Sequence, residues 1–277
     1  MKPVEPIIVV DLFRPLLAKL LGLLGGLSQA KWQAPTVCSG WSVKDVALHL
    51  LGGDIGILSR KRDGYSPGGP VHNADELLTL VNTLNATWVD ATRRISPRLL
   101  CEMLSHLGEE LCLYFDQVDP FALGEPVSWA GPDPAPVWLD LAREYTEKWH
   151  HQQQIRDAVG AAPLYGFRYF HPVLDAFVRA LPFTLRDVAA PDGSIVRLTI
   201  RGESGGEWLA VRQTDGWSLF VDQEAIAVPI AAAEIEQDLA WRLFTKGIDV
   251  ETARTRATLI GDEAIALKVL GMVSVIA

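Results

Sequence analysis

Apolar residues recur at helical spacing along the first 160 residues of the chain, between clusters of glycine, proline and polar residues. This pattern predicts five helices, over about 9–24, 43–60, 75–94, 97–115 and 136–159. Two of them have clear start signals: Ser42 is followed three residues later by Asp45, and Ser96 is followed directly by Pro97. Helices that carry wide apolar stripes and are joined by loops of modest length are typical of an antiparallel helical bundle.

The stretch from 119 to 136 interrupts the helical pattern. It contains five prolines and two glycines. Proline lacks the backbone N–H that a helix interior or a central strand needs. We therefore expect neither a long helix nor a central strand here.

Beyond Gly160 the helical periodicity gives way to short apolar runs. Asp215-Gly216 ahead of Trp217 is a hairpin signal. We expect strands over 194–200, 206–211 and 225–230.

Helical spacing returns near the end of the chain, where we expect helices over 232–244, stopped by Gly247, and 262–269. Mixed helices and mostly antiparallel strands define an α+β domain. The predicted fold class is therefore α plus α+β, with a helical bundle over 1–162 and an α+β domain over 163–277.

The segment 7–27 is apolar enough to raise the question of a membrane span. A spanning helix needs about 20 largely uncharged residues. Here Asp11, Arg14 and Lys19 interrupt the run, and Pro15 lies inside it. No basic region followed by a small-residue cleavage site precedes the segment. We expect an amphipathic or buried helix, and neither membrane binding nor a signal peptide.

Charge and composition narrow the class of partners. With 25 Lys and Arg against 34 Asp and Glu, the net charge of −9 disfavours non-specific nucleic-acid binding. Hydrophobic residues make up 49% of the 277 residues, which is typical of a folded globular protein. Three cysteines are too few for a disulfide framework and point to a reducing, cytoplasmic environment.

Two helices carry polar groups that indicate chemistry. His49 falls among leucines in the second predicted helix, where an imidazole needs a hydrogen-bond partner or an exposed position. In the last bundle helix, Glu144, Glu147, His151 and Gln154 fall within about 80° of one another around the helix axis. Such a stripe is either solvated or faces a polar site inside the bundle.

A catalytic zinc-type site takes three protein ligands, for which His and Glu are suitable, and leaves one position open. Glu147 and His151 lie four residues apart on one helix face and can reach the same ion. His49 is the natural third ligand from a neighbouring helix. His150 and Glu144 are the alternatives to His151 and Glu147 if the helix phase differs.

The sequence PTVCSGWSVKDV (35–46), followed by His49, resembles the entry to the metal-binding helix of the DinB-like superfamily. It is similar in particular to mycothiol-dependent maleylpyruvate isomerases. The segment from Glu147 through Trp149 to His151 resembles that family's Glu-x-Trp-x-His motif. The tail from Gly261 resembles the family's sterol-carrier-like C-terminal domain. The resemblance covers nearly the whole chain, and it implies a DinB-like bundle followed by a sterol-carrier-like α+β domain.

The resemblance also implies a function. The family's metal triad maps onto His49, Glu147 and His151, with zinc as the first expectation for the divalent ion. Mycothiol or another small thiol would be the cosubstrate, because such an ion lowers the pKa of a bound thiol and makes a thiolate available at neutral pH. The thiolate would add to a small electrophile, in an isomerase or a transferase reaction. Gln154 would contact the cofactor or orient a ligand.

Two alternatives to a thiol-dependent enzyme are a non-catalytic metal- or small-ligand-binding protein of the same fold, and a metal-dependent hydrolase. The expected partners are a small electrophile and a small thiol, and the expected oligomeric state is a monomer or a homodimer.

The remaining candidates are interpreted as structural. Cys38 has no basic residue beside it in the sequence and is read as a loop residue, and Cys101 and Cys112 are read as core residues. Trp41 and Trp149 are close enough in sequence to the proposed ligands to line the metal pocket. The other histidines are interpreted as surface or loop residues: His72, His106 and His171.

Overall fold

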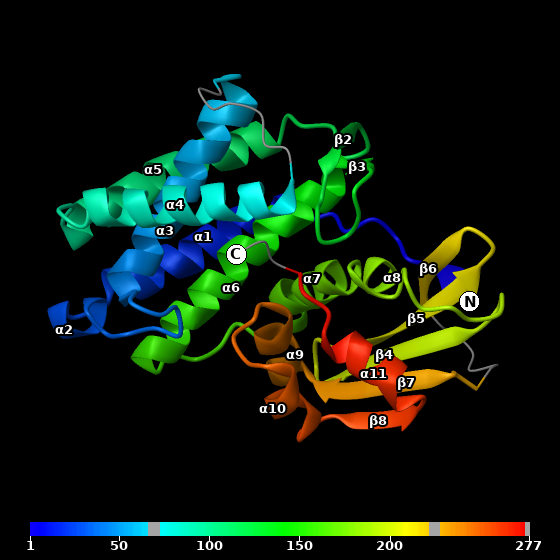
Figure 1. Cartoon of the computed structure of the whole chain (residues 1–277). Helices are drawn as coiled ribbons and strands as arrows, with labels where there is room; N and C mark the ends of the chain where they lie inside the picture. The colour runs from blue at the N-terminus through cyan, green and yellow to red at the C-terminus, as the bar shows by residue number, and fades with distance from the viewer. Residues whose placement is uncertain (66–72, 222–227, 275–277) are drawn as a thin grey trace. The chain divides into compact units, whose positions relative to one another are not determined.

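The computed structural model describes residues 1–65, 73–221 and 228–274, and its first helices begin and end close to their sequence signals (Figure 1). The helices of this part of the chain are α1 (Val10–Gly25), α2 (Gln29–Trp32), α3 (Val43–Ile57), α4 (Ala74–Thr92), α5 (Pro97–Phe115) and α6 (Val137–Val159). A π-helical turn, η1 (Leu58–Arg62), extends α3.

Local chemistry explains the helix ends that matter for the site. At the start of α3, Ser42 Oγ accepts the Asp45 backbone N–H and the Asp45 carboxylate accepts the Ser42 N–H, which is a capping box. At the end of α6, Gly160 adopts a left-handed φ of 66° and the Ala161 N–H bonds to the Arg156 carbonyl. Glycine tolerates that conformation, so α6 ends there.

The chain divides into two compact units. The bundle unit consists of Val9–Asp119 and Glu144–Leu164. The sheet unit consists of Met1–Ile8, Pro120–Arg143 and the chain from Tyr165 onward. Helix α6 therefore begins in the sheet unit and has its greater part in the bundle unit.

The core of the bundle unit consists of apolar side chains, most of them from α1, α3, α5 and α6. Leu24, Leu48, Leu100 and Ile155 are each almost completely buried in it. Helix α3 lies at the centre, in contact with both α4 and α5. Because α3 and α6 are both anchored in this core, polar groups that they carry are held by a rigid framework.

The proline-rich stretch forms a small hairpin in the sheet unit. Strands β2 (Leu123–Pro126) and β3 (Pro134–Pro136) pair antiparallel over a few residues. The expectation that this stretch holds no long helix and no central strand is confirmed.

Six strands of the described residues form the main sheet, in the order β1-β6-β5-β4-β7-β8. They are β1 (Lys2–Pro3), β4 (Ile195–Arg201), β5 (Gly206–Gln213), β6 (Gly216–Val221), β7 (Ala231–Glu236) and β8 (Thr258–Gly261). Neighbouring strands are antiparallel except β4 and β7, which are parallel. The predicted strands over 194–200 and 206–211 and the hairpin before Trp217 are confirmed.

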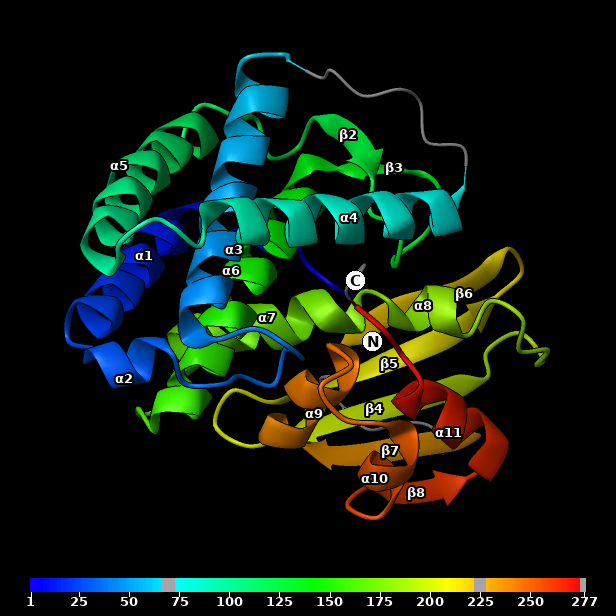
Figure 2. The ribbon, with the colours of Figure 1, turned by 60° about the vertical axis from the view of Figure 1, so that its left-hand side comes forward.

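One face of this sheet is covered by helices (Figure 2). Val196 and Leu198 of β4 pair with Ala210 and Trp208 of β5, and all four are buried. Helices α9 (Gln237–Phe244) and α11 (Glu263–Leu270) contact β4 and β7. The mixed helix-and-sheet fold with an N-terminal helical domain is the one that the sequence predicts.

Two predicted elements in this half are wrong in part. The helix expected over 232–244 begins only at Gln237, because 231–236 forms β7 between β4 and β8. Alanine favours helices, but here Ala231–Ala233 are buried in the sheet, where β4 and β8 pair with them on both sides. The strand expected over 225–230 lies outside the described residues up to 227, and 228–230 is not a strand.

Among the described residues the sequence pattern also missed four helices, which are α2, α7 (Phe167–Val178), α8 (Leu181–Thr184) and α10 (Val250–Arg254). Helix α7 contains Pro172, yet Phe170, Val173, Leu174 and Phe177 are all completely buried along one face. Burial of that face outweighs the backbone hydrogen bond that Pro172 removes. Each described helix is too short or too polar to traverse a bilayer.

Candidate metal centre

His49 is held in α3 by the apolar residues on either side of it in the sequence. Leu48, Leu50 and Leu51 are buried in the core of the bundle unit, whereas the His49 side chain turns away from them and is 12% exposed. The Trp41 ring lies against it, with the ring centroids 5.2 Å apart. The imidazole is thereby fixed with its Nε2 atom directed at α6.

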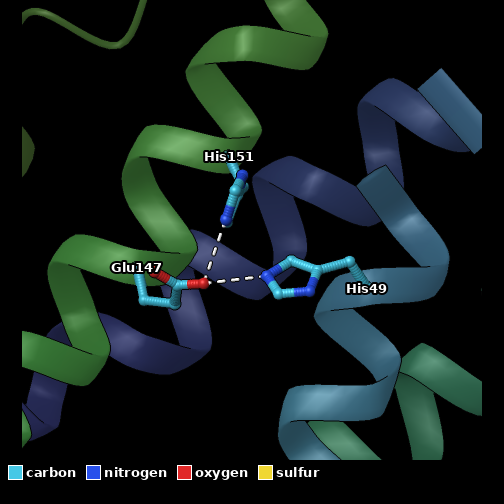
Figure 3. A group of neighbouring side chains, drawn as sticks. All are labelled: His49, Glu147 and His151. Carbon is cyan, nitrogen blue, oxygen red and sulfur yellow. Dashed lines mark hydrogen bonds and ion pairs between the residues drawn. The ribbon is translucent and has the colours of Figure 1, made fainter. Parts of the chain in front are cut away.

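Helix α6 supplies two further polar groups at the same point (Figure 3). His49 Nε2 lies 2.9 Å from Oε1 of Glu147, and His151 Nε2 lies 3.0 Å from the same oxygen. One ligand atom from each of the three residues lies within 4.8 Å of the other two. The structure therefore brings together the three residues that the sequence singles out, from helices almost 100 positions apart.

Gln154 fixes the orientation of His151. Its Oε1 atom lies 2.7 Å from His151 Nδ1 and 3.2 Å from the Cys38 sulfur, and the Gln154 side chain is buried. An amide oxygen only accepts hydrogen bonds, so His151 donates from Nδ1 and presents Nε2 to Glu147. The structure thus places Gln154 behind a candidate ligand, where it orients that ligand.

The two alternative ligands are placed differently. His150 Nδ1 bonds to the Thr146 backbone carbonyl at 3.0 Å and lies 3.9 Å from Glu147 Oε2. Glu144 is buried one turn before Glu147. Among the described residues, the group of potential ligands that converge contains neither of them.

The charges at this point are strongly coupled. Burial raises the pKa of Glu147, but the charge of His151 and the hydrogen bonds from both imidazoles outweigh it and hold that pKa well below its usual range. Burial lowers the pKa of His151, but the Glu147 carboxylate outweighs burial and raises it to about 10. Burial and the neighbouring His151 lower the pKa of His150 to about 3. A metal ion that binds Nε2 of His151 therefore has to displace a proton from that imidazole, so metal binding at this site depends on pH.

Cys38 lies closer to this chemistry than its sequence neighbours indicate. The turn Cys38-Ser39-Gly40-Trp41 is closed by the Trp41 N–H on the Cys38 carbonyl, and Gly40 supplies the positive φ of 76° that the turn requires. This turn brings the thiol to Gln154 and His151. Cys38 is the loop residue that the sequence predicts, but its thiol does have a basic side chain near it, because His151 comes from α6.

The two glutamines before Gln154 are structural. Gln152 donates to the Leu16 carbonyl of α1, and Gln153 accepts the Leu164 backbone N–H beyond the end of α6. Both side chains are buried and hydrogen-bonded. They connect α6 to α1 and to the segment that follows α6.

Of the other predicted residues, Trp149 is buried and its indole N–H donates to the Leu164 carbonyl. Cys112 is a buried core residue, Cys101 is partly buried, and His106 is exposed on α5. His171 is not a free surface residue, because it is half-buried on α7 and bonded to the Ser204 carbonyl. His72 lies outside the described residues.

The donor set fits a divalent metal ion. Two imidazole nitrogens and one carboxylate oxygen are a ligand set that catalytic zinc sites use, with a fourth position left for water or substrate. Ligands about 2.0–2.1 Å from a tetrahedral ion are roughly 3.3 Å apart, so the 2.9 and 3.0 Å separations need only a small expansion. The Glu147 side chain is 35% exposed, which leaves the site open on one side.

Comparisons with known proteins agree with this fold. Residues 13–156 match the family described as the mycothiol maleylpyruvate isomerase N-terminal domain. Two crystal structures of mycothiol-dependent maleylpyruvate isomerase, one of them of a histidine-to-alanine mutant, superpose with a TM-score of 0.52 over 90% of both chains, at 13% and 12% identity. A comparison with curated proteins gives no significant match.

The fold and site define a helical-bundle protein with a converging His-Glu-His group, joined to a mixed helix-and-sheet unit. The family match spans more than half of the chain, from 13 to 156. The chain belongs to the mycothiol maleylpyruvate isomerase N-terminal domain family.

Proposed function

We propose that the chain is a metal-dependent enzyme that uses a low-molecular-weight thiol of the mycothiol type to isomerise a small electrophile such as maleylpyruvate, or to transfer the thiol to it. The observation that carries the proposal is the convergence of ligand atoms from His49, Glu147 and His151 within 4.8 Å in a chain of this family.

In the proposed enzyme the three residues hold one divalent ion. His49 and His151 bind through Nε2, and Glu147 binds through its carboxylate, which already lies about 3 Å from both nitrogens. Zinc is the first expectation, although this ligand set also suits other first-row metals. When bound, such an ion lowers the pKa of a thiol so that a thiolate is available near neutral pH.

The residues around the ligands have separate tasks in this proposal. Gln154 holds the Nδ1 proton of His151 and keeps Nε2 free for the ion. Trp41 covers the ring of His49 and limits the access of water from that side. The Glu147 side chain is partly exposed, and the thiol and the electrophile approach the site from this open side.

The experiment that tests the proposal is a turnover assay of the purified full chain loaded with Zn²⁺. Isomerisation of maleylpyruvate, and thiol transfer to a panel of small electrophiles, are measured with and without mycothiol. We expect turnover only when both metal and thiol are present, and loss of turnover after chelation. The His106→Ala variant is the control, because His106 is an exposed histidine on α5, which carries none of the three ligands.

The outcomes separate the alternatives. Metal-dependent hydrolysis of a compound in the panel without any thiol would identify a hydrolase and contradict the thiol-dependent reaction. Stoichiometric metal with no turnover on any substrate would favour a non-catalytic binding protein. Either of these two results would overturn the proposed function.

A further inference from the structure

Helices α3 and α6 share a second polar contact besides the candidate metal centre. Lys148 Nζ on α6 forms an ion pair with Oδ1 of Asp54 on α3. The Asp54 side chain is 3% exposed and the Lys148 side chain 20%. Both line a small, mainly apolar cavity of about 30 Å³ together with Phe13, Leu20 and Leu50. The two charges therefore pair in surroundings of low polarity, where such a contact is strong and specific in geometry. The charges of Glu144 and Glu147 also act on Lys148.

The position of this pair relates it to the ligands. Lys148 directly follows Glu147 in α6, and Asp54 lies five residues beyond His49, about 7.5 Å further along α3. A single contact point leaves two packed helices free to rotate about that point. Two points on the same pair of helices fix both their rotation and their relative shift.

We propose that Asp54 and Lys148 are positioning residues whose ion pair sets the register of α3 against α6. Through this register the pair holds His49 within reach of the two ligands on α6. The inference rests on the proposed function, because it assigns a task to residues around the same metal centre.

Apolar packing alone does not explain the register. Leu51 of α3 and Ile155 of α6 belong to the same core cluster. Apolar contacts are non-directional and tolerate small displacements between side chains of similar volume. A buried ion pair is satisfied in a narrow range of positions, and an Asp or Lys left unpaired there is costly. A displacement of α3 along α6 would therefore break the pair before it disrupted the core.

The test compares Co²⁺ binding by the full wild-type chain and by the double variant Asp54→Leu/Lys148→Met. This variant replaces both charges of the pair by apolar side chains of similar length, so neither charge stays buried without the other and the bundle is expected to fold. Glu144, whose charge also acts on Lys148, is retained. We expect Co²⁺ to bind about 10–100-fold more weakly, which is the usual effect of losing groups that orient metal ligands. We also expect a changed Co²⁺ visible absorption spectrum, which a loss of stability alone would not produce.

Arg93→Met is the matched control. Arg93 forms an ion pair with Asp45 of α3, with Nε 2.8 Å from Oδ1, but it lies at the end of α4, which carries none of the three ligands. We expect this variant to be less stable but to bind Co²⁺ with the affinity and spectrum of the wild type.

Wild-type Co²⁺ affinity and spectrum in a folded Asp54→Leu/Lys148→Met variant would overturn the inference and leave the proposed function intact. If the double variant does not fold, the isosteric variant Asp54→Asn decides: weaker binding with an altered spectrum supports the inference, and unchanged binding overturns it. Absence of Co²⁺ binding by the wild type would instead overturn the proposed function, and with it this inference.

Discussion

His151 Nδ1 and Gln154 Oε1 lie 2.7 Å apart, on the side of the imidazole that faces away from Glu147. The two residues are three positions apart in α6, so the helix itself brings them together. This hydrogen bond determines which nitrogen of His151 is available to an ion, and the choice of nitrogen depends on a residue that is not itself a proposed ligand.

Replacement of Gln154 therefore tests whether it orients His151. Gln154→Leu keeps the approximate size but removes the acceptor, and we expect the Zn²⁺ affinity to fall by about 10–100-fold. Gln154→Glu retains an acceptor for the Nδ1 hydrogen. We expect it to bind Zn²⁺ with an affinity close to that of the wild type. Titration against a competing chelator measures both. Equal affinities of Gln154→Leu and the wild type would contradict the assigned role.

Two adjacent glycines of α3 give a prediction about packing near His49. A Cβ atom at Gly52 would lie 2.6 Å from the Trp88 ring, whose indole N–H bonds to the Leu48 carbonyl, whereas a Cβ atom at Gly53 meets nothing within 4 Å. Gly52→Ala is expected to destabilise the protein by about 1–3 kcal/mol through overpacking. Gly53→Ala is expected to stabilise it by about 0.5–1 kcal/mol, because alanine is the better helix former.

Urea denaturation of the two variants measures this difference. The two substitutions are the same chemical change at neighbouring positions, so each serves as the control for the other. Equal effects of both variants would show that the Trp88 contact does not constrain α3.

Asp45 gives a pH-dependent prediction. Burial raises the pKa of Asp45, but hydrogen bonds from Arg93 and Ser42 outweigh burial and lower that pKa below its usual value. A carboxyl whose pKa is lower in the folded state stabilises the fold above its unfolded pKa of about 3.9, and this contribution is lost as the pH falls. We expect Asp45→Asn to cost about 1–2 kcal/mol at pH 7, and the difference from the wild type to shrink below about pH 4.

Free energies of unfolding from urea titrations at pH 7, 5 and 3.5 check this expectation. Asp90→Asn is the control, because Asp90 also pairs with Arg93 but its side chain is 70% exposed, so its effect should stay within about 0.5 kcal/mol. A destabilisation by Asp45→Asn that is the same at all three pH values would contradict the argument.

The sequence predicts the helices of the first half well because their boundaries depend on local chemistry. The capping box of Ser42 and Asp45 and the left-handed Gly160 act within a few residues of themselves. The sheet unit is harder to predict. Ala231–Ala233 have helical propensity, but they form the central strand β7 because β4 and β8 pair with them on both sides. That pairing depends on residues about 30 positions away.

The candidate site shows the same limit. Helical spacing places Glu147 and His151 on one face, but it carries no information on the distance to His49, which depends on the packing of α3 against α6. The proximity of Cys38 to His151 follows from a turn in the loop before α3. Asp54 and Lys148 show no sequence signal at all, because an acid and a base 94 residues apart are common in any chain. The domain boundary after residue 162, the cytoplasmic location and the oligomeric state stay predictions.

The metal content of purified variants tests the central claim most directly. Elemental analysis is made on the wild type and on His49→Ala, His151→Ala and His106→Ala, all exchanged into the same Zn²⁺-containing buffer and desalted. We expect about one Zn²⁺ per chain in the wild type and in His106→Ala, and none in the other two, since each loses one of three ligands. Full Zn²⁺ occupancy in both His49→Ala and His151→Ala would contradict the proposed centre.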